Sequence, residues 1–215
     1  MTLRNSTLAA VGALLAVAVV LAIVLSQTTR HAIGSNFVPP QAFVAQVPGG
    51  ARVCQSREHI PSGTGAIQVR IGTFGRPGPR LELSVAGPTG GTLARRVRTA
   101  GWPEGDVAIP VARLGERQGA EVCLRNAGSA PIAVAGGRTL GAAAVVGGQP
   151  ASGGITLRYL EPEARSWWGF APEIADRVAR LRDAPPGALT LPLFLVLAIG
   201  TLAAAVALVL REARR

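Results

Sequence analysis

The strongest constraint in this sequence is an unbroken apolar run of 18 residues from Leu8 to Leu25. As an α-helix this run extends about 27 Å, close to the thickness of the hydrocarbon core of a bilayer. A cleaved signal peptide is the rival interpretation, but its apolar core is usually shorter and is followed by a small-x-small cleavage motif. Nothing suitable follows Leu25. We therefore predict a transmembrane helix over 8–25, preceded by a cytoplasmic segment of residues 1–7.

A second apolar run, residues 189–210, lies near the other end of the chain. As a helix it extends about 33 Å, and an arginine-rich tail, residues 211–215, follows it directly. Basic residues beside a membrane span mark its cytoplasmic side, so both termini are predicted to be cytoplasmic. Residues 26–188 then lie outside the bacterial cytoplasmic membrane. Neither apolar run contains an ionisable residue, so no ion pathway is indicated.

The formal net charge of +10 raises the question of nucleic-acid binding, because arginines neutralise phosphates. The basic residues are scattered singly, apart from Arg95, Arg96 and Arg98, and no basic stripe is interleaved with aromatic residues. We therefore predict no nucleic-acid partner. All 22 basic residues are arginine and 27 residues are glycine, a composition typical of a bacterium with a GC-rich genome.

Residues 51–160 alternate between apolar and polar side chains in short runs that glycine and proline separate. Clear examples are Ile67–Ile71, Leu81–Val85 and Val107–Val111. Period-2 alternation predicts strands with one buried face, and about eight or nine such strands without a helical stretch predict an all-β domain. Because the apolar face of every strand must be covered, we expect an antiparallel, jelly-roll-like sandwich, with a closed barrel as the alternative.

Residues 26–50, which precede this domain, show no sustained periodicity. They are polar at first and are then interrupted by Pro39-Pro40 and Pro48-Gly49-Gly50. Proline and glycine at this density favour irregular structure, so we interpret the segment as a linker between the first membrane span and the sandwich.

The segment 161–188 joins the β-rich domain to the second apolar run. It contains an aromatic cluster, followed by apolar residues at positions i, i+4 and i+7, which form one stripe of an amphipathic helix. Because Trp favours the level of lipid headgroups, we predict that this short juxtamembrane helix lies at the membrane–water interface. Closing one end of the sandwich is the alternative. The predicted interface residues are Trp167, Trp168, Phe170, Ile174, Val178 and Leu181.

The two cysteines, Cys54 and Cys123, both lie between the apolar runs. An isolated pair in an oxidising compartment predicts one disulfide, which stabilises the fold by about 4 kcal/mol in the chain-entropy model. A metal or redox site is the alternative, but no CxxC motif occurs. Strict alternation puts Cys123 on the face opposite Val122 and Leu124. The disulfide is thus expected on the outer face of a sheet, unless a bulge reverses the register.

No catalytic motif is evident. The sequence lacks the GxSxG, HExxH, P-loop and Rossmann glycine patterns, and His59 has no apparent nucleophile partner, so a solvated loop residue is the plainer interpretation. The acidic pairs Glu104/Asp106 and Glu161/Glu163 adjoin prolines, which indicates turns rather than a catalytic carboxylate pair. We predict no enzymatic activity, no cofactor and no metal site.

Three residues are candidates for ligand contacts. Trp102 precedes Pro103 and suits stacking on a sugar from a loop, although a partly buried turn aromatic fits the same pattern. Arg96 and Arg98 share one face of a predicted strand and suit an acidic polymer or phospholipid headgroups, although a solvated face is the plainer interpretation.

Three short stretches resemble a set of uncharacterised membrane proteins from high-GC Gram-positive bacteria. They are Val53-Cys54-Gln55, the segment Val122–Gly128, and Ser166-Trp167-Trp168 followed by Arg177. In those proteins an extracytoplasmic β-sandwich occurs alone or attached to a membrane glycosyltransferase. The resemblance covers about residues 51–182 and implies a setting in envelope polysaccharide assembly, without catalytic residues to transfer.

Taken together, these patterns favour a non-enzymatic, membrane-tethered β-sandwich that acts as a glycan-binding or accessory module. The expected partners are the lipid bilayer, an envelope glycan or lipid-linked saccharide, and a membrane glycosyltransferase or transporter. The alternative is a structural subunit that docks onto a larger membrane enzyme or transporter complex, since both apolar runs contain small residues that permit close helix packing.

Overall fold

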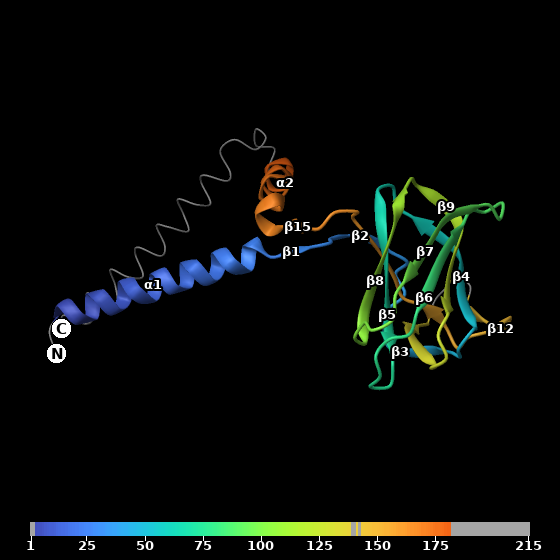
Figure 1. Cartoon of the computed structure of the whole chain (residues 1–215). Helices are drawn as coiled ribbons and strands as arrows, with labels where there is room; N and C mark the ends of the chain where they lie inside the picture. Colours follow the sequence, from blue (N-terminus) through green and yellow to red (C-terminus); the bar gives the residue numbers. More distant parts are fainter. Residues whose placement is uncertain (1–2, 139–140, 142, 182–215) are drawn as a thin grey trace. The chain divides into compact units, whose positions relative to one another are not determined.

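The computed structural model describes residues 3–138, 141 and 143–181 (Figure 1). The chain divides into two compact units. One unit, residues 30–164, is made of strands; the other contains the described residues 3–29 and 165–181. The second predicted membrane span, residues 189–210, and the predicted tail over 211–215 lie outside the described residues.

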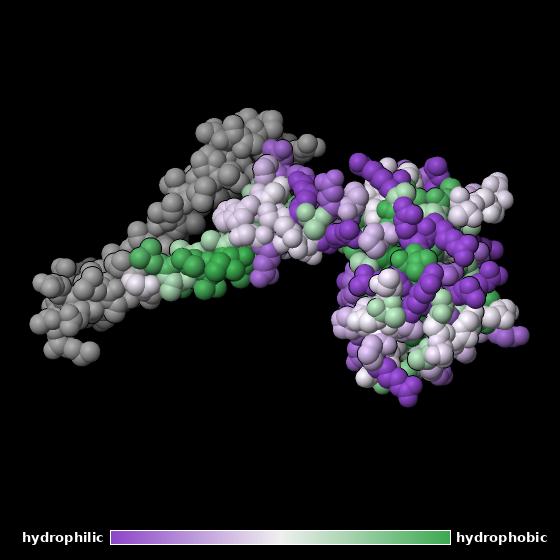
Figure 2. All heavy atoms as spheres, in the orientation of Figure 1, coloured by the Kyte–Doolittle hydropathy of each residue, from purple (hydrophilic) through white to green (hydrophobic). Residues whose placement is uncertain are grey.

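The smaller unit consists of two helices and a minimal two-stranded sheet. Helix α1 (Leu3–Ser26) contains the first apolar run, and its side chains from Leu15 to Val24 are exposed (Figure 2). Strand β1 (Thr28–Thr29) pairs antiparallel with β15 (Arg165–Ser166), and helix α2 (Trp167–Leu181) follows directly. Counting only residues that the structure describes, no helix is both long enough and apolar enough to cross a membrane.

The larger unit is a β-sandwich of two open sheets in which all strand pairs are antiparallel. The six-stranded sheet has the order β12 (Gln149–Pro150), β11 (Val145–Val146), β4 (Arg52–Ile60), β9 (Arg117–Asn126), β6 (Leu81–Ala86), β7 (Thr92–Arg98). The seven-stranded sheet has the order β13 (Gly154–Ile155), β10 (Ile132–Gly137), β5 (Thr64–Gly72), β14 (Leu157–Leu160), β2 (Ala32–Ser35), with β3 (Ala42–Val47) paired to β10 and β8 (Gly105–Leu114) paired to β5. The predicted sandwich is therefore confirmed, and the sheets do not close into a barrel.

Eight of these strands form a nested series of pairs. β6 pairs with β7, β5 with β8, β4 with β9 and β3 with β10. Successive pairs alternate between the two sheets, so the chain folds as one long hairpin rolled upon itself. This arrangement brings segments that are far apart in the sequence to the same edge of the sandwich.

The interpretation of residues 26–50 as a linker is wrong. The segment contains β1, β2 and β3, and β3 contributes Ala45 and Val47 to the core. β2 pairs with β14, and β3 pairs with β10. These short strands form although their sequence shows no strong period, because partner strands that lie late in the chain supply the hydrogen bonds that hold them extended.

The predicted alternation is confirmed where it was clearest in the sequence. In β6, Leu81, Leu83 and Val85 are fully buried, whereas Glu82 and Ser84 are only partly buried. β10 differs, because all six of its residues are buried. Fully burying one aliphatic side chain of this size contributes about 1.5–3 kcal/mol, so the core between the sheets dominates the stability of the unit.

Candidate ligand-binding site

A β-bulge in β4 orients the polar side chains that form the candidate site. β4 pairs regularly with β9 up to Gln55, opposite Val122, and pairing resumes at Glu58, opposite Ala120. β4 thus carries one residue more than β9 across this interval, and Arg57 has a φ of 62°. The extra residue inverts the alternation of the strand, so Gln55 and Glu58 are both buried although they lie three positions apart.

The Glu58 carboxyl is held between the two sheets by hydrogen bonds. The Tyr159 hydroxyl, on β14, donates to Oε2 at 2.5 Å, and Nδ2 of Asn36 donates to Oε1 at 3.3 Å. Asn36 is itself fixed by the backbone: Nδ2 donates to the Ile155 carbonyl at 2.8 Å, and Oδ1 accepts from the Leu157 amide at 3.1 Å. One polar network therefore joins the bulge of β4 to strands β13 and β14 of the other sheet.

Burial raises the pKa of the Glu58 carboxyl, while the hydrogen bonds from Tyr159 and Asn36 act in the opposite direction. Burial also raises the pKa of Tyr159, and the neighbouring Glu58 charge adds to that effect. Tyr159 therefore remains the hydrogen-bond donor of the pair, and Glu58 holds its proton to a higher pH than a solvated glutamate does.

This pKa shift predicts a pH dependence of stability. Because the folded state binds the Glu58 proton more tightly than the unfolded chain does, the contribution of Glu58 to stability falls as the pH rises above 4.5. We expect Glu58→Gln, a neutral isostere, to lose this dependence. Denaturant unfolding at several pH values should show the variant gaining in free energy of unfolding relative to the wild type as the pH rises from about 4 to 7. A constant difference across that range contradicts the prediction.

A pocket with a volume of about 460 Å³ opens beside Glu58. Its size lies within the range of about 300–1,000 Å³ that is common for small-molecule sites. The lining comes from residues 35–38 at the end of β2 and just after it, residues 55–59 of β4, and Arg138 and Gly141 after β10. The nested strand pairing thus gathers three separate segments around one cavity.

Two residues in the lining have a strained backbone. Phe37 has a φ of 57° and Arg57 a φ of 62°; Phe74, elsewhere, is the third non-glycine residue with a positive φ in the described part of the chain. Non-glycine residues rarely adopt this left-handed conformation, which costs about 1–2 kcal/mol. The side chain of Phe37 is nonetheless 92% exposed, so burial of its ring does not offset the strain. Strain of this kind often marks a functional site.

Positive charge surrounds the mouth of the pocket. Arg57 and Arg138 are exposed, and neither guanidinium has a carboxylate of a described residue within ion-pair distance. His59, which the sequence predicted to lie in a loop, instead lies on β4. Its Nε2 is 3.8 Å from Oε1 of Glu116. Glu58 is the single acidic residue in the described lining.

The structure places the side chain of Trp102 in the core. Its side chain is 4% exposed, and Nε1 donates a hydrogen bond of 2.8 Å to the carbonyl of Pro79. A Cβ on Gly78 would lie 2.1 Å from Cδ2 of the indole, so only glycine lets the backbone approach the ring this closely. The indole thus packs mainly in the core, but it also lines, with Arg98, a pocket of about 510 Å³, and its role in sugar stacking stays a prediction.

Arg96 and Arg98 do share one strand face, but it is the face that points towards the other sheet. They lie opposite Leu83 and Leu81, whose side chains are buried, on β7 at the edge of the six-stranded sheet. Nη1 of Arg98 donates to the Ala108 carbonyl of β8 at 3.1 Å. Arg98 thus bridges the two sheets. Inward-pointing charges on an edge strand discourage pairing with other chains, which is one role for both arginines. Arg98 also lines the pocket next to Trp102, and ligand contact by either arginine stays a prediction.

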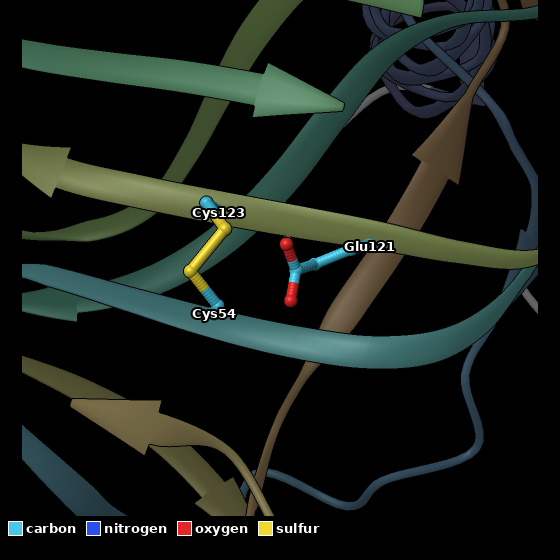
Figure 3. A group of neighbouring side chains, drawn as sticks. All are labelled: Cys54, Glu121 and Cys123. Carbon is cyan, nitrogen blue, oxygen red and sulfur yellow. A yellow bond between two sulfur atoms is a disulfide. The ribbon is translucent and has the colours of Figure 1, made fainter. Parts of the chain in front are cut away.

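The predicted disulfide between Cys54 and Cys123 is present (Figure 3). The two residues lie directly opposite each other on β4 and β9, with a Cα–Cα distance of 4.0 Å. Their neighbours Val53 and Leu124 point into the core, so the disulfide lies on the outer face of the sheet, and the bulge comes after it. Glu121 is the third member of this group and accepts a hydrogen bond from Ser56, but the disulfide leaves no thiolate for a metal.

The predicted interface residues all belong to α2. Trp167, Trp168 and Ile174 are about half exposed, and the guanidinium of Arg165 lies 4.4 Å from the ring centroid of Phe170. The side chains of the remaining two, Val178 and Leu181, lie outside what the structure describes. Contact of this helix with a bilayer stays a prediction.

No family model, curated protein or solved structure matches this chain. The resemblance to envelope-assembly proteins stays a prediction.

The pocket was missed in the sequence because two of its three segments carried no strong pattern. Phe37 lies in the supposed linker, and Arg138 follows a glycine pair that marks a turn. One signal was available: counting back from Ile60 in steps of two puts Glu58 on an inward-facing position. A glutamate where the alternation demands an apolar residue indicates a buried polar network.

Proposed function

We propose that this chain is a membrane-tethered extracytoplasmic β-sandwich that binds a saccharide as a non-enzymatic module of cell-envelope assembly. The observation that carries the proposal is the pocket beside Glu58, where an exposed aromatic ring meets several hydrogen-bonding side chains. A sugar ring presents an apolar C–H face and a periphery of hydroxyl groups. An exposed phenylalanine next to hydroxyl, imidazole and guanidinium groups complements both parts.

The strand order supports the same proposal at the level of the fold. We infer that the sandwich is a jelly roll, because its nested pairs alternate between the two sheets. Jelly rolls are common among lectin domains. One fold hosts many functions, so the chemistry of the pocket carries the proposal.

The proposed membrane tether and the proposed extracytoplasmic location of the sandwich are supported by independent features. The apolar run from Leu8 to Leu25 lies within a single helix, α1, and its described apolar side chains from Leu15 to Val24 are exposed, as a helix in contact with lipid requires. The Cys54–Cys123 disulfide favours an oxidising compartment outside the cytoplasm. We propose that both termini are cytoplasmic, which leaves the sandwich outside.

The proposal predicts that Phe37 dominates saccharide binding. Because the chain is proposed to be membrane-tethered, it is expected to stay in the membrane pellet after alkaline washing. The full chain is then extracted into detergent and titrated with cellotetraose, maltotetraose and tetragalacturonate by calorimetry. Replacing Phe37 with alanine removes the stacking surface and is expected to weaken binding about tenfold. Phe74→Ala is the matched control, since Phe74 is also exposed and has a φ of 56° but lies outside the pocket.

Equal affinities for the wild type and Phe37→Ala, or equal losses in the two phenylalanine variants, contradict a saccharide site at this pocket. A chain that binds none of the probes but co-purifies in constant stoichiometry with a membrane enzyme or transporter favours the alternative role as a docking subunit.

A further inference from the structure

Two arginines at the rim of the pocket, Arg57 and Arg138, form no ion pair with any residue that the structure describes. Arg57 and Arg138 approach the pocket from different strands, one from the bulge of β4 and the other from the end of β10. Several other exposed arginines of the sandwich, Arg76 among them, likewise form no ion pair with a described residue, whereas Arg70 pairs with Asp106 at 2.7 Å and Arg95 pairs with Glu82 at 3.1 Å. Arg57 and Arg138 differ from these unpaired arginines because they line one pocket. The two arginines at the pocket thus retain their hydrogen-bonding capacity for a ligand.

The bulge in β4 fixes the position of one of these arginines, Arg57. Arg57 occupies the extra position of β4, in a left-handed conformation, while its neighbours Gln55 and Glu58 are anchored in the interior. The backbone under Arg57 is therefore held on both sides, and the side chain is directed outward beside the pocket. A guanidinium presents a planar fork of N–H donors, which matches the oxygens of a carboxylate or a phosphate.

We propose that the ligand is an anionic saccharide, whose carboxylate or phosphate group binds Arg57 and Arg138 while its sugar ring contacts Phe37. This inference rests on the proposed function and narrows its ligand class. A neutral saccharide would leave two guanidinium groups at the pocket without an anionic partner, whereas an anionic one satisfies both and still uses the aromatic ring.

Two further features agree with an anionic ligand. Between residues 30 and 164 the sequence has 14 arginines and 8 acidic residues, a formal net charge of +6 for the sandwich, which attracts anions towards it. Within the described lining Glu58 is the single acid, and its carboxyl lies below the surface, bound to Tyr159 and Asn36. Burial raises its pKa, so the repulsion that it exerts on an anion is reduced.

To test this inference, the full chain in detergent is titrated with matched probes. Tetragalacturonate and its methyl-esterified form differ in charge but share the sugar backbone, and glucose 1-phosphate is compared with glucose and with inorganic phosphate. We expect tetragalacturonate or glucose 1-phosphate to bind at least tenfold more tightly than its neutral counterpart. The double variant Arg57→Gln, Arg138→Gln is expected to reduce this ratio to about one. Arg76→Gln, which removes the same charge from an exposed loop outside the pocket, is the control and should preserve it.

The remaining outcomes separate this inference from the proposed function. A preference for glucose 1-phosphate that depends on both arginines supports the inference and identifies phosphate as the anion; a preference for tetragalacturonate identifies a carboxylate. Equal binding of charged and neutral saccharides that Phe37→Ala weakens overturns the inference and leaves the proposed function standing. Inorganic phosphate binding as tightly as glucose 1-phosphate, without dependence on Phe37, overturns the inference because the site is then an anion site without a sugar contact. Absence of binding to all probes overturns both.

Discussion

Replacing Cys54 and Cys123 together with alanine is expected to lower the free energy of unfolding by about 4 kcal/mol. The disulfide links residues 69 positions apart, and closing a loop of this length lowers the conformational entropy of the unfolded chain. Denaturant unfolding of the sandwich, followed by the circular dichroism of its strands, measures the change.

Reduction provides the control for this experiment. A reducing agent should destabilise the wild type by a similar amount and leave the double alanine variant unchanged, because only the wild type has a disulfide to lose. A loss below about 1 kcal/mol in the double variant would show that the β4–β9 pairing already restricts the unfolded chain, so that the chain-entropy account does not hold here.

Trp102→Ala is the second substitution with a large expected effect. The indole is almost fully buried, and its removal leaves a cavity against Gly78 and an unpaired carbonyl at Pro79. Removal of a buried tryptophan costs about 3–5 kcal/mol. Because this is comparable to the stability of a whole domain, the variant is expected to populate the unfolded state already at low denaturant.

Trp168→Ala is the matched control, since Trp168 is 54% exposed and its replacement should change stability by less than about 0.5 kcal/mol. The conservative variant Trp102→Phe should recover part of the lost stability. If Trp102→Ala instead unfolds like the wild type but no longer binds a saccharide, then Trp102 belongs to the binding site and its assignment to the core is incorrect.

The comparison of Trp102 with Phe37 shows why aromatic residues are difficult to assign from sequence. Both lie next to turn-forming residues, and Trp102 was the candidate for ligand contacts. In the structure the two differ in exposure, because the backbone at Gly78 approaches the indole of Trp102 while no described element covers the ring of Phe37. Exposure of a loop residue depends on which distant segment packs against it, and local sequence carries little information about that.

Alternation by itself determined the all-β class and the inward faces of strands such as β6, because side-chain direction in a strand depends only on neighbouring residues. The presence of two isolated cysteines was likewise sufficient to predict their disulfide. Tertiary structure alone decided the rest. The bulge at Arg57 put both Gln55 and Glu58 on the inward side of β4, and nested pairing brought Phe37, Glu58 and Arg138 to one pocket. Pairing register and chain folding are set by contacts between residues far apart in the sequence, which no local period encodes.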